Sequence, residues 1–144
     1  MKSGWKGGVT TSAEETISLG KSLSQFIESG DVITLEGDLA AGKTTFVKGI
    51  LLGLNFKHEV TSPTFTLINE YESTPKVIHM DCFRESNLQR WINLGIQDYF
   101  YSDDVKIIEW PEIILELIPK NHIHITLKSL SEFERKINIK RKIF

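Results

Sequence analysis

The chain has 144 residues and a mass of 16.4 kDa, a length that predicts a single domain spanning residues 1–144. With 40% hydrophobic residues, 25% charged residues and a formal net charge of −2, the composition excludes a disordered chain. The same charge balance excludes a protein whose entire surface binds nucleic acid or anionic membrane. No apolar run approaches the roughly 20 residues of a membrane span, and the first 15 residues lack the apolar stretch of a signal peptide. We therefore expect a cytoplasmic protein with no membrane contact. The single cysteine, Cys82, cannot form an internal disulfide, so nothing in the sequence requires an oxidising compartment.

The first third of the chain is predicted to form a helix, a strand, a turn and a second helix. Ser12 and Glu15 have the spacing of a helix-starting capping box, and Gly30 marks the expected end of that helix. Its expected apolar face consists of Ile17, Leu23, Phe26 and Ile27. The run 32–35 (VITL) predicts a short strand that leads into a Gly-rich turn. The second helix is predicted from apolar residues at helical spacing: Phe46, Val47, Ile50, Leu51 and Leu54.

The rest of the chain continues the alternation. Extended segments are expected at 65–68, 77–81 and 105–109, with helices at 86–100 and after Pro111. Residues 122–127 alternate strictly, which predicts one strand face of Ile123, Ile125 and Leu127 and an exposed face of His122, His124 and Thr126. With Ile137 and Ile139, this strand predicts a C-terminal antiparallel hairpin. Strand and helix alternation indicates an α/β fold.

The strongest motif is GDLAAGKT at residues 37–44, which fits the phosphate-binding pattern G-x4-G-K-S/T. Gly37 and Gly42 permit backbone angles that let successive N–H groups converge on phosphate oxygens. The following helix adds the positive end of its dipole. Lys43 is placed to reach the β and γ phosphates, and the Thr44 hydroxyl suits Mg²⁺. The motif predicts a nucleotide-binding loop between a strand and a helix, but by itself it does not indicate hydrolysis or a particular substrate.

Two acidic residues end predicted strands downstream of this loop. Asp81 follows the run 77–80 and Glu109 follows 105–108, where an acid can hold Mg²⁺ or polarise the attacking water. Two roles stay open for His79, which shares the strand face of Asp81: it orients that carboxylate, or it is a satisfied core histidine. Cys82 is expected to be a packed apolar side chain.

Five segments together are similar to one family, the bacterial ATPases of tRNA threonylcarbamoyladenosine biosynthesis, called TsaE or YjeE. The matching segments are GDLAAGKTTF (37–46), VTSPTFTLINEY (60–71), HMDCFR (79–84), LGIQDYF (94–100) and EWPE (109–112). The resemblance extends from about Val9 to Ile125. It implies a P-loop NTPase fold with a compact, mixed and largely parallel sheet flanked by helices, and it implies ATP and Mg²⁺ as cofactors. It also implies an ATPase that acts with two partners, a threonylcarbamoyl-transferase subunit and its inactive paralogue.

The resemblance also implies roles for individual residues. It places ATP phosphates on Ala40, Ala41, Gly42, Lys43, Thr44 and Thr45, and Mg²⁺ on Thr44 and Glu109. Asp81 takes a Walker-B-like or water-activating role, and Thr64 in a switch loop senses the γ-phosphate. Trp110 matches a family aromatic residue, and the base is expected near residues 11–14. The family usually has Gly at the position of Ala40, where a positive φ would strain an alanine.

These features predict a Mg²⁺-dependent ATPase that is slow without its partners and that contacts tRNA only through the complex. Between Thr44 and Glu134 the only arginines are Arg84 and Arg90, and the chain has no lid-sized insertion. A small-molecule or nucleotide kinase is therefore the less favoured alternative. A non-catalytic, nucleotide-gated binding module is the other alternative.

Charge is unevenly distributed along the chain. Residues 1–134 contain all 19 acidic residues and 12 basic ones, a formal charge of −7, whereas residues 135–144 carry +5. This basic end either contacts tRNA or an acidic partner, or it is a solvated edge strand that lysines protect from pairing. We favour the edge strand.

Overall fold

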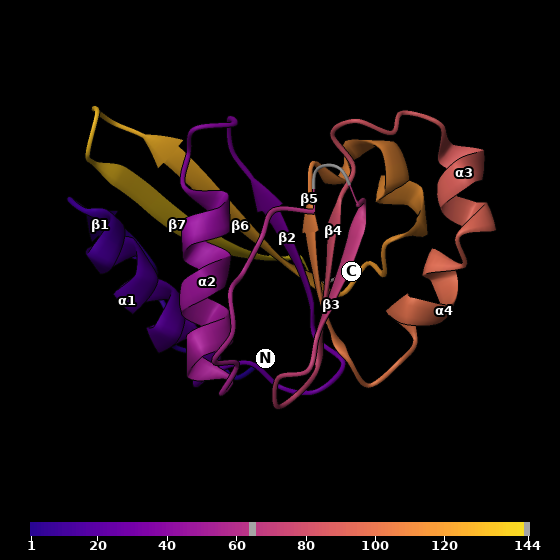
Figure 1. Ribbon diagram of the computed structural model, residues 1–144, viewed down its shortest axis with the longest axis horizontal. Helices are drawn as coiled ribbons and strands as arrows, with labels where there is room; N and C mark the ends of the chain where they lie inside the picture. Colours follow the sequence, from indigo (N-terminus) through magenta and orange to yellow (C-terminus); the bar gives the residue numbers. More distant parts are fainter. Residues whose placement is uncertain (64–65, 143–144) are drawn as a thin grey trace.

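The computed structural model describes residues 1–63 and 66–142, which form one seven-stranded sheet with helices on both faces (Figure 1). The strands are β1 (Gly8–Thr10), β2 (Val32–Glu36), β3 (Ile68–Tyr71), β4 (Val77–Asp81), β5 (Val105–Glu109), β6 (His122–Ser129) and β7 (Arg135–Lys142). The α-helices are α1 (Ala13–Ser24), α2 (Lys43–Gly53), α3 (Leu88–Asn93) and α4 (Ile96–Phe100), and η1 (Pro111–Leu117) is a 3-10 helix.

The sheet is parallel at its centre and antiparallel at both edges. The strand order is β1-β7-β6-β2-β5-β4-β3, in which β6, β2, β5 and β4 run parallel to one another. The hairpin β6–β7, the pair β1–β7 and the pair β3–β4 are antiparallel. The predicted α/β class, the mixed sheet flanked by helices and the C-terminal hairpin are therefore confirmed.

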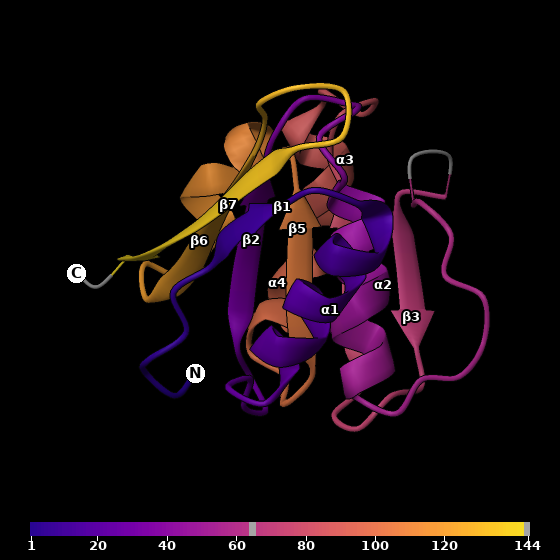
Figure 2. The same cartoon turned by 90° about the vertical axis from the view of Figure 1, so that its left-hand side faces the viewer.

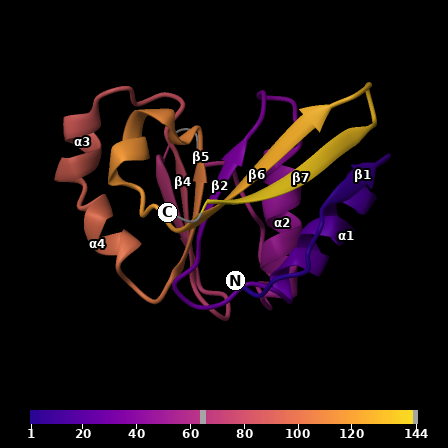
Figure 3. The ribbon, with the colours of Figure 1, turned by 180° about the vertical axis from the view of Figure 1, so that it is seen from behind.

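Alternate residues of the central strands face two separate apolar clusters. Ile33 and Ile107 pack with α1 and α2, whereas Val32 and Ile108 pack with α3, α4 and η1. Figure 1 and the rear view in Figure 3 show α1 and α2 at one end of the molecule and α3 and α4 at the other. The phosphate-loop motif thus begins α2, on the first of these two faces.

Two glycines allow α1 and α2 to pack backbone against backbone. A Cβ on Gly20 would lie 2.3 Å from the carbonyl oxygen of Phe46, and one on Gly49 would lie 2.1 Å from that of Ile17. No side chain fits at either position, so the two helices fix each other's place. Since Lys43 begins α2, this contact also holds the phosphate loop.

The helix α1 starts as the sequence predicts but ends earlier. Ser12 is its N-cap and accepts a hydrogen bond from the Glu15 backbone N–H at 3.1 Å. The Glu15 carboxylate accepts from the Thr11 backbone N–H instead of the N–H of Ser12, so the capping box is only half formed. The helix ends at Ser24, well before Gly30, and Ile27 is buried from the segment that follows it.

The basic C-terminal strand is only partly an edge strand. β1, which the sequence did not predict, pairs with its first part, with Gly8 opposite Ile137 and Thr10 opposite Arg135. Figure 2 shows β1 lying along β7 on the side of α1. Within the described ranges, no helix is long and apolar enough to cross a membrane.

Candidate functional site

The ends of three parallel strands bring the predicted site residues together. β2 leads into the phosphate loop, β5 ends in Glu109 and β4 ends in Asp81. The register places Leu35 opposite Glu109 and Glu109 opposite Asp81. The carboxyl ends of adjacent parallel strands therefore present the loop and both acids at one edge of the sheet, where α/β proteins bind ligands.

Of the two loop glycines, only Gly42 has the left-handed backbone that the sequence predicts, because Gly37 has no positive φ. Gly42 has φ 90° and is the N-cap of α2. A Cβ on Gly37 would lie 2.6 Å from the carbonyl oxygen of Leu127 in β6, so the loop runs close against that strand. The non-glycine residues with positive φ in the described part of the chain are Asn55, Leu67 and Trp110. Ala40 is not among them, so alanine causes no left-handed strain in the loop.

Lys43 is almost completely buried at the centre of the site. Its ammonium group donates a hydrogen bond to the carbonyl oxygen of Gly37 at 2.6 Å and lies 3.8 Å from a carboxylate oxygen of Glu109. It also lies 4.1 Å from the centre of the Trp110 ring, a cation–π distance. Loss of hydration lowers the pKa of Lys43, while the charges of Glu109, Asp81, Glu112 and Asp38 oppose that shift. These carboxylates keep a cation in a place where burial disfavours one.

Glu109 binds His79 as well as facing Lys43. The distance from His79 Nε2 to Glu109 Oε2 is 2.6 Å, and both side chains are buried. Because a carboxylate oxygen accepts, Nε2 carries the proton of this hydrogen bond. Nδ1 is buried and has no hydrogen-bond partner among the described atoms. His79 therefore orients Glu109 and not Asp81, which corrects one of the two roles left open by the sequence.

Asp81 and Trp110 complete the wall of the site. Asp81 is buried, and its carboxylate accepts a hydrogen bond from the Phe83 backbone N–H at 2.9 Å. Trp110 has φ 53°, a conformation that a large side chain rarely adopts, and its ring lies 4.8 Å from that of Phe83. This conformation turns the indole over Lys43. Cys82 is buried beside the site, as expected, and burial raises the pKa of its thiol.

The remaining predicted residues lie at the loop and at the switch segment. Thr44 and Thr45 are in the first turn of α2 and are half-buried. Thr64 lies outside the described residues. The segment leading to it is anchored by Tyr71, whose hydroxyl donates to the carbonyl oxygen of Thr61 at 2.8 Å and accepts from the Thr61 N–H at 3.3 Å. Asn69 also donates to that carbonyl, at 3.2 Å.

The oxygen donors of the site fit a magnesium ion. Thr44 offers a hydroxyl, and Asp81 and Glu109 offer buried carboxylates from neighbouring strand ends. Mg²⁺ prefers such hard oxygen ligands and usually binds through one or two carboxylates together with substrate phosphates. The set is thus suited to a cation that arrives with a nucleotide at the phosphate loop.

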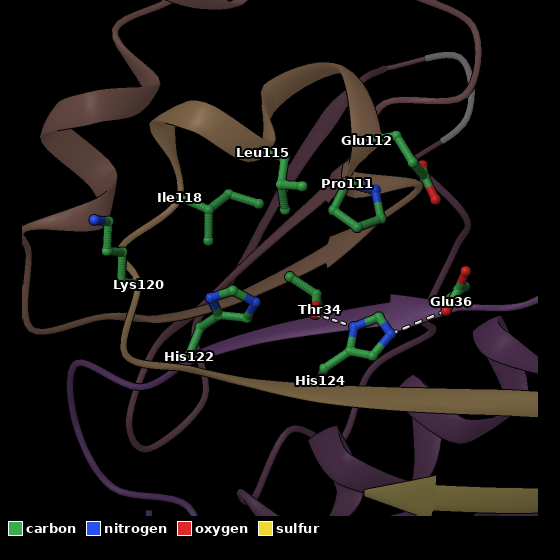
Figure 4. A pocket seen from close by; sticks show the side chains of 9 residues that line it. All are labelled: Thr34, Glu36, Pro111, Glu112, Leu115, Ile118, Lys120, His122 and His124. Atoms are coloured by element: carbon green, nitrogen blue, oxygen red, sulfur yellow. Dashed lines mark hydrogen bonds and ion pairs between the residues drawn. The ribbon is translucent and has the colours of Figure 1, made fainter. Parts of the chain in front are cut away.

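A hollow of about 360 Å³ lies beneath η1, on the face of β2 that is opposite to α1 and α2. Figure 4 shows His122 and His124 on its floor, with Pro111 above and Glu36 at one end. His124 lies 2.7 Å from the Thr34 hydroxyl and 2.9 Å from a carboxylate oxygen of Glu36. His122 lies 2.7 Å from the carbonyl oxygen of Pro119 and is buried. The expected exposed face is therefore wrong, because His122 is buried and His124 and Thr126 are half-buried.

Arg135 is the site residue that the sequence reasoning missed. Its guanidinium donates a hydrogen bond to the carbonyl oxygen of Ala40, in the phosphate loop, at 3.2 Å. The residue begins β7 and was interpreted only as part of the basic end of the chain. No local pattern could find it, because the contact joins residues 95 positions apart.

Comparisons with known proteins agree on one family. The family model described as Threonylcarbamoyl adenosine biosynthesis protein TsaE matches residues 10–137. The chain is 39% identical over 131 residues to the tRNA threonylcarbamoyladenosine biosynthesis protein TsaE of Treponema pallidum, covering 91% of this chain and 97% of that protein. It is 41% identical over 129 residues to the protein of the same name from Bacillus subtilis, covering 89% and 80% of the two chains. The crystal structure of Bacillus subtilis YdiB superposes with a TM-score of 0.81 at 37% identity, covering 94% of this chain and 84% of the other.

Proposed function

The chain belongs to the TsaE family of tRNA threonylcarbamoyladenosine biosynthesis proteins, and from this we propose that it is a Mg²⁺-dependent ATPase acting within a multiprotein complex of that pathway. The observation that carries the proposal is the position of Lys43. It lies at the start of α2, behind a glycine-rich loop, with the carboxylates of Glu109 and Asp81 on adjacent strand ends. A buried lysine between a phosphate loop and two acids suits phosphoryl transfer from a nucleotide.

The roles of the chain's own groups follow from this geometry. Backbone N–H groups of residues 40–45 and the start of α2 bind the phosphates, and Lys43 neutralises their charge. Mg²⁺, held by Thr44 and Glu109, supplies further neutralisation of the γ-phosphate when bound. His79 keeps the Glu109 carboxylate in place. Asp81 either acts on the metal or polarises the attacking water, and Trp110, which packs against Phe83, lies over the Lys43 ammonium.

We propose that the partners are the threonylcarbamoyl-transferase subunit and its inactive paralogue, and that tRNA is contacted through them. Two apolar side chains beside the phosphate loop support a partner surface at this end. Leu39 in the loop is 71% exposed, and Phe133, in the turn that precedes Arg135, is 68% exposed. A partner that covers them would exclude water from the adjoining site, so turnover is expected to be slow for the chain alone.

Nucleotide titration and phosphate release test the ATPase proposal. Lys43→Ala should abolish tight binding of ATP, whereas Lys48→Ala, an exposed lysine of the same helix, should bind like the wild type. Asp81→Ala and Glu109→Ala should bind nucleotide and lose phosphate release measured with the partner proteins. Normal hydrolysis by both acid variants would refute the assigned roles.

The same assays distinguish the two alternatives. A kinase would yield a phosphorylated product in a metabolite screen with ATP. A nucleotide-gated binding module would bind ATP but release no phosphate even with both partners present. Depletion of the protein followed by nucleoside analysis of bulk tRNA tests the pathway role, and an unchanged level of threonylcarbamoyladenosine would contradict it.

A further inference from the structure

The C-terminal hairpin reaches the phosphate loop through one side chain, that of Arg135. Its Nη2 donates to the carbonyl oxygen of Ala40 at 3.2 Å. The two hydrogens of its Nη1 are shared among three carbonyl oxygens of the β6–β7 turn: Ser131 at 3.0 Å, Glu132 at 3.2 Å and Glu134 at 3.0 Å. Figure 1 and Figure 2 show this turn and the phosphate loop rising at the same end of the molecule. The guanidinium thus joins two loops that are distant in sequence.

The turn holds the guanidinium in a fixed orientation. Three carbonyls surround Nη1, and the backbone of Arg135 pairs with Thr10 on one side and Ser129 on the other. A side chain anchored at both ends loses little further freedom when it contacts the loop. The arginine fork suits this bridging role better than a lysine ammonium.

The contact fixes one peptide group of the phosphate loop from both sides. Arg135 holds the carbonyl of Ala40, while the N–H of the same peptide, at Ala41, donates to the Asp38 carbonyl at 2.9 Å. The carbonyl is thus directed toward the start of β7. Rotation of this peptide would move the N–H groups that follow it, so Arg135 restrains the shape of the loop that binds phosphate.

Part of the guanidinium remains available to a ligand. Arginine has five N–H donors, and the bonds above engage Nη1 and one hydrogen of Nη2. Nε and the second Nη2 hydrogen have no partner within residues 1–63 and 66–142. Nε lies 3.9 Å from the place that a Cβ on Gly42 would occupy. A permanent positive charge with free donors is therefore held against the N-cap of α2, where an anion is expected.

We propose that Arg135 is a positioning residue of the phosphate loop, which holds the Ala40–Ala41 peptide and supplies a positive charge in cis beside the nucleotide phosphates. The inference rests on nucleotide binding at residues 37–44, as proposed above. It also assigns the start of β7 to the site, instead of to a solvated edge.

Calorimetric titration of the full-length protein with ADP and with pyrophosphate tests this inference. Arg135→Gln should weaken the affinity for each by about tenfold, since a charged group and its hydrogen bond are removed from a half-buried site. Arg135→Lys should lie between Arg135→Gln and the wild type, because an ammonium keeps the charge without the fork. Lys136→Gln is the matched control: it removes the same charge from the adjacent, exposed position and should bind within about twofold of the wild type.

Salt dependence and thermal unfolding separate this role from a purely structural one. The difference in affinity between wild type and Arg135→Gln should shrink in about 1 M NaCl, where charges are screened beyond roughly 3 Å. A lower unfolding temperature with unchanged affinity for both ligands would show that Arg135 only closes the turn, and would overturn the inference. If Arg135→Gln does not fold, wild-type affinity in Arg135→Lys overturns it equally. Failure of the wild type to bind ADP would instead refute the proposed function.

Discussion

Removing the imidazole of His79 should lower the free energy of unfolding by about the contribution of one buried hydrogen bond to a charged group. His79 and Glu109 are both buried and are joined at 2.6 Å. His79→Leu places an apolar side chain of similar size beside Tyr71 and removes the hydrogen-bond donor to Glu109. Since Nδ1 has no described partner, only this one hydrogen bond is lost from the ring.

The expected loss is that of a buried hydrogen bond to a charged group, about 1.5–3 kcal/mol. Lys43, at 3.8 Å, still compensates part of the Glu109 charge, which argues against the larger cost of a fully isolated buried carboxylate. For a chain of this size, the unfolding temperature should fall by about 5–10 °C. His79→Gln, which can place an amide donor near the position of Nε2, should recover part of the loss.

A double-mutant cycle in urea isolates the pairwise contribution. The single variants His79→Leu and Glu109→Leu, each of which removes one partner of the hydrogen bond, and their combination should show a coupling free energy of at least about 1.5 kcal/mol. Additivity within about 0.5 kcal/mol would refute the claim that His79 holds Glu109. The Mg²⁺ dependence of phosphate release by His79→Leu provides a second readout. If His79 had only a structural role, the Mg²⁺ concentration that gives half the maximal rate would not change.

Three further predictions concern packing, reactivity and pH. Gly49→Ala should lower the free energy of unfolding by about 3 kcal/mol, because its Cβ would lie 2.1 Å from the Ile17 carbonyl oxygen. Urea unfolding measures this loss, with Lys48→Ala as the control, and equal stability of the two variants would contradict the close helix contact. Cys82 should react with a thiol reagent only when the chain unfolds, because burial raises the pKa of its thiol; rapid labelling of the folded protein would contradict this. Burial lowers the pKa of Lys106, so the folded chain binds fewer protons than the unfolded chain between that lowered value and about 10.4, and stability rises with pH there. Urea unfolding above about pH 8 should show wild type gaining stability over Lys106→Met, and a constant difference would refute the assignment.

Local patterns were sufficient to predict the centre of the fold. The apolar run of β2, the glycines of the phosphate loop and the helical spacing in α2 are all contiguous in sequence, so each signal is complete within about 25 residues. The acids Asp81 and Glu109 could be assigned to strand ends for the same reason. That they lie side by side depends on β4 pairing with β5, which parallel topology makes plausible but a single sequence does not specify.

Features that depend on strand order could not be predicted. His79 binds Glu109 and not Asp81 because the two strands pair in a register that no local pattern contains. His122 is buried because η1 folds back over β6. β1 has only three residues and begins with glycine, so it lacks the apolar alternation that marks a strand.

The pairing of β1 with β7 has a consequence for the order of events during protein synthesis. Thr10 leaves the ribosome early, but its sheet partner Arg135 is translated 125 residues later. The phosphate loop likewise exists as nascent chain well before the guanidinium that holds Ala40. A nascent or truncated chain that ends before β7 would therefore present β1 and one side of β6 with unsatisfied backbone groups. Such chains should be substrates for chaperones and proteases, and only a completed C-terminal hairpin would release the protein from that surveillance.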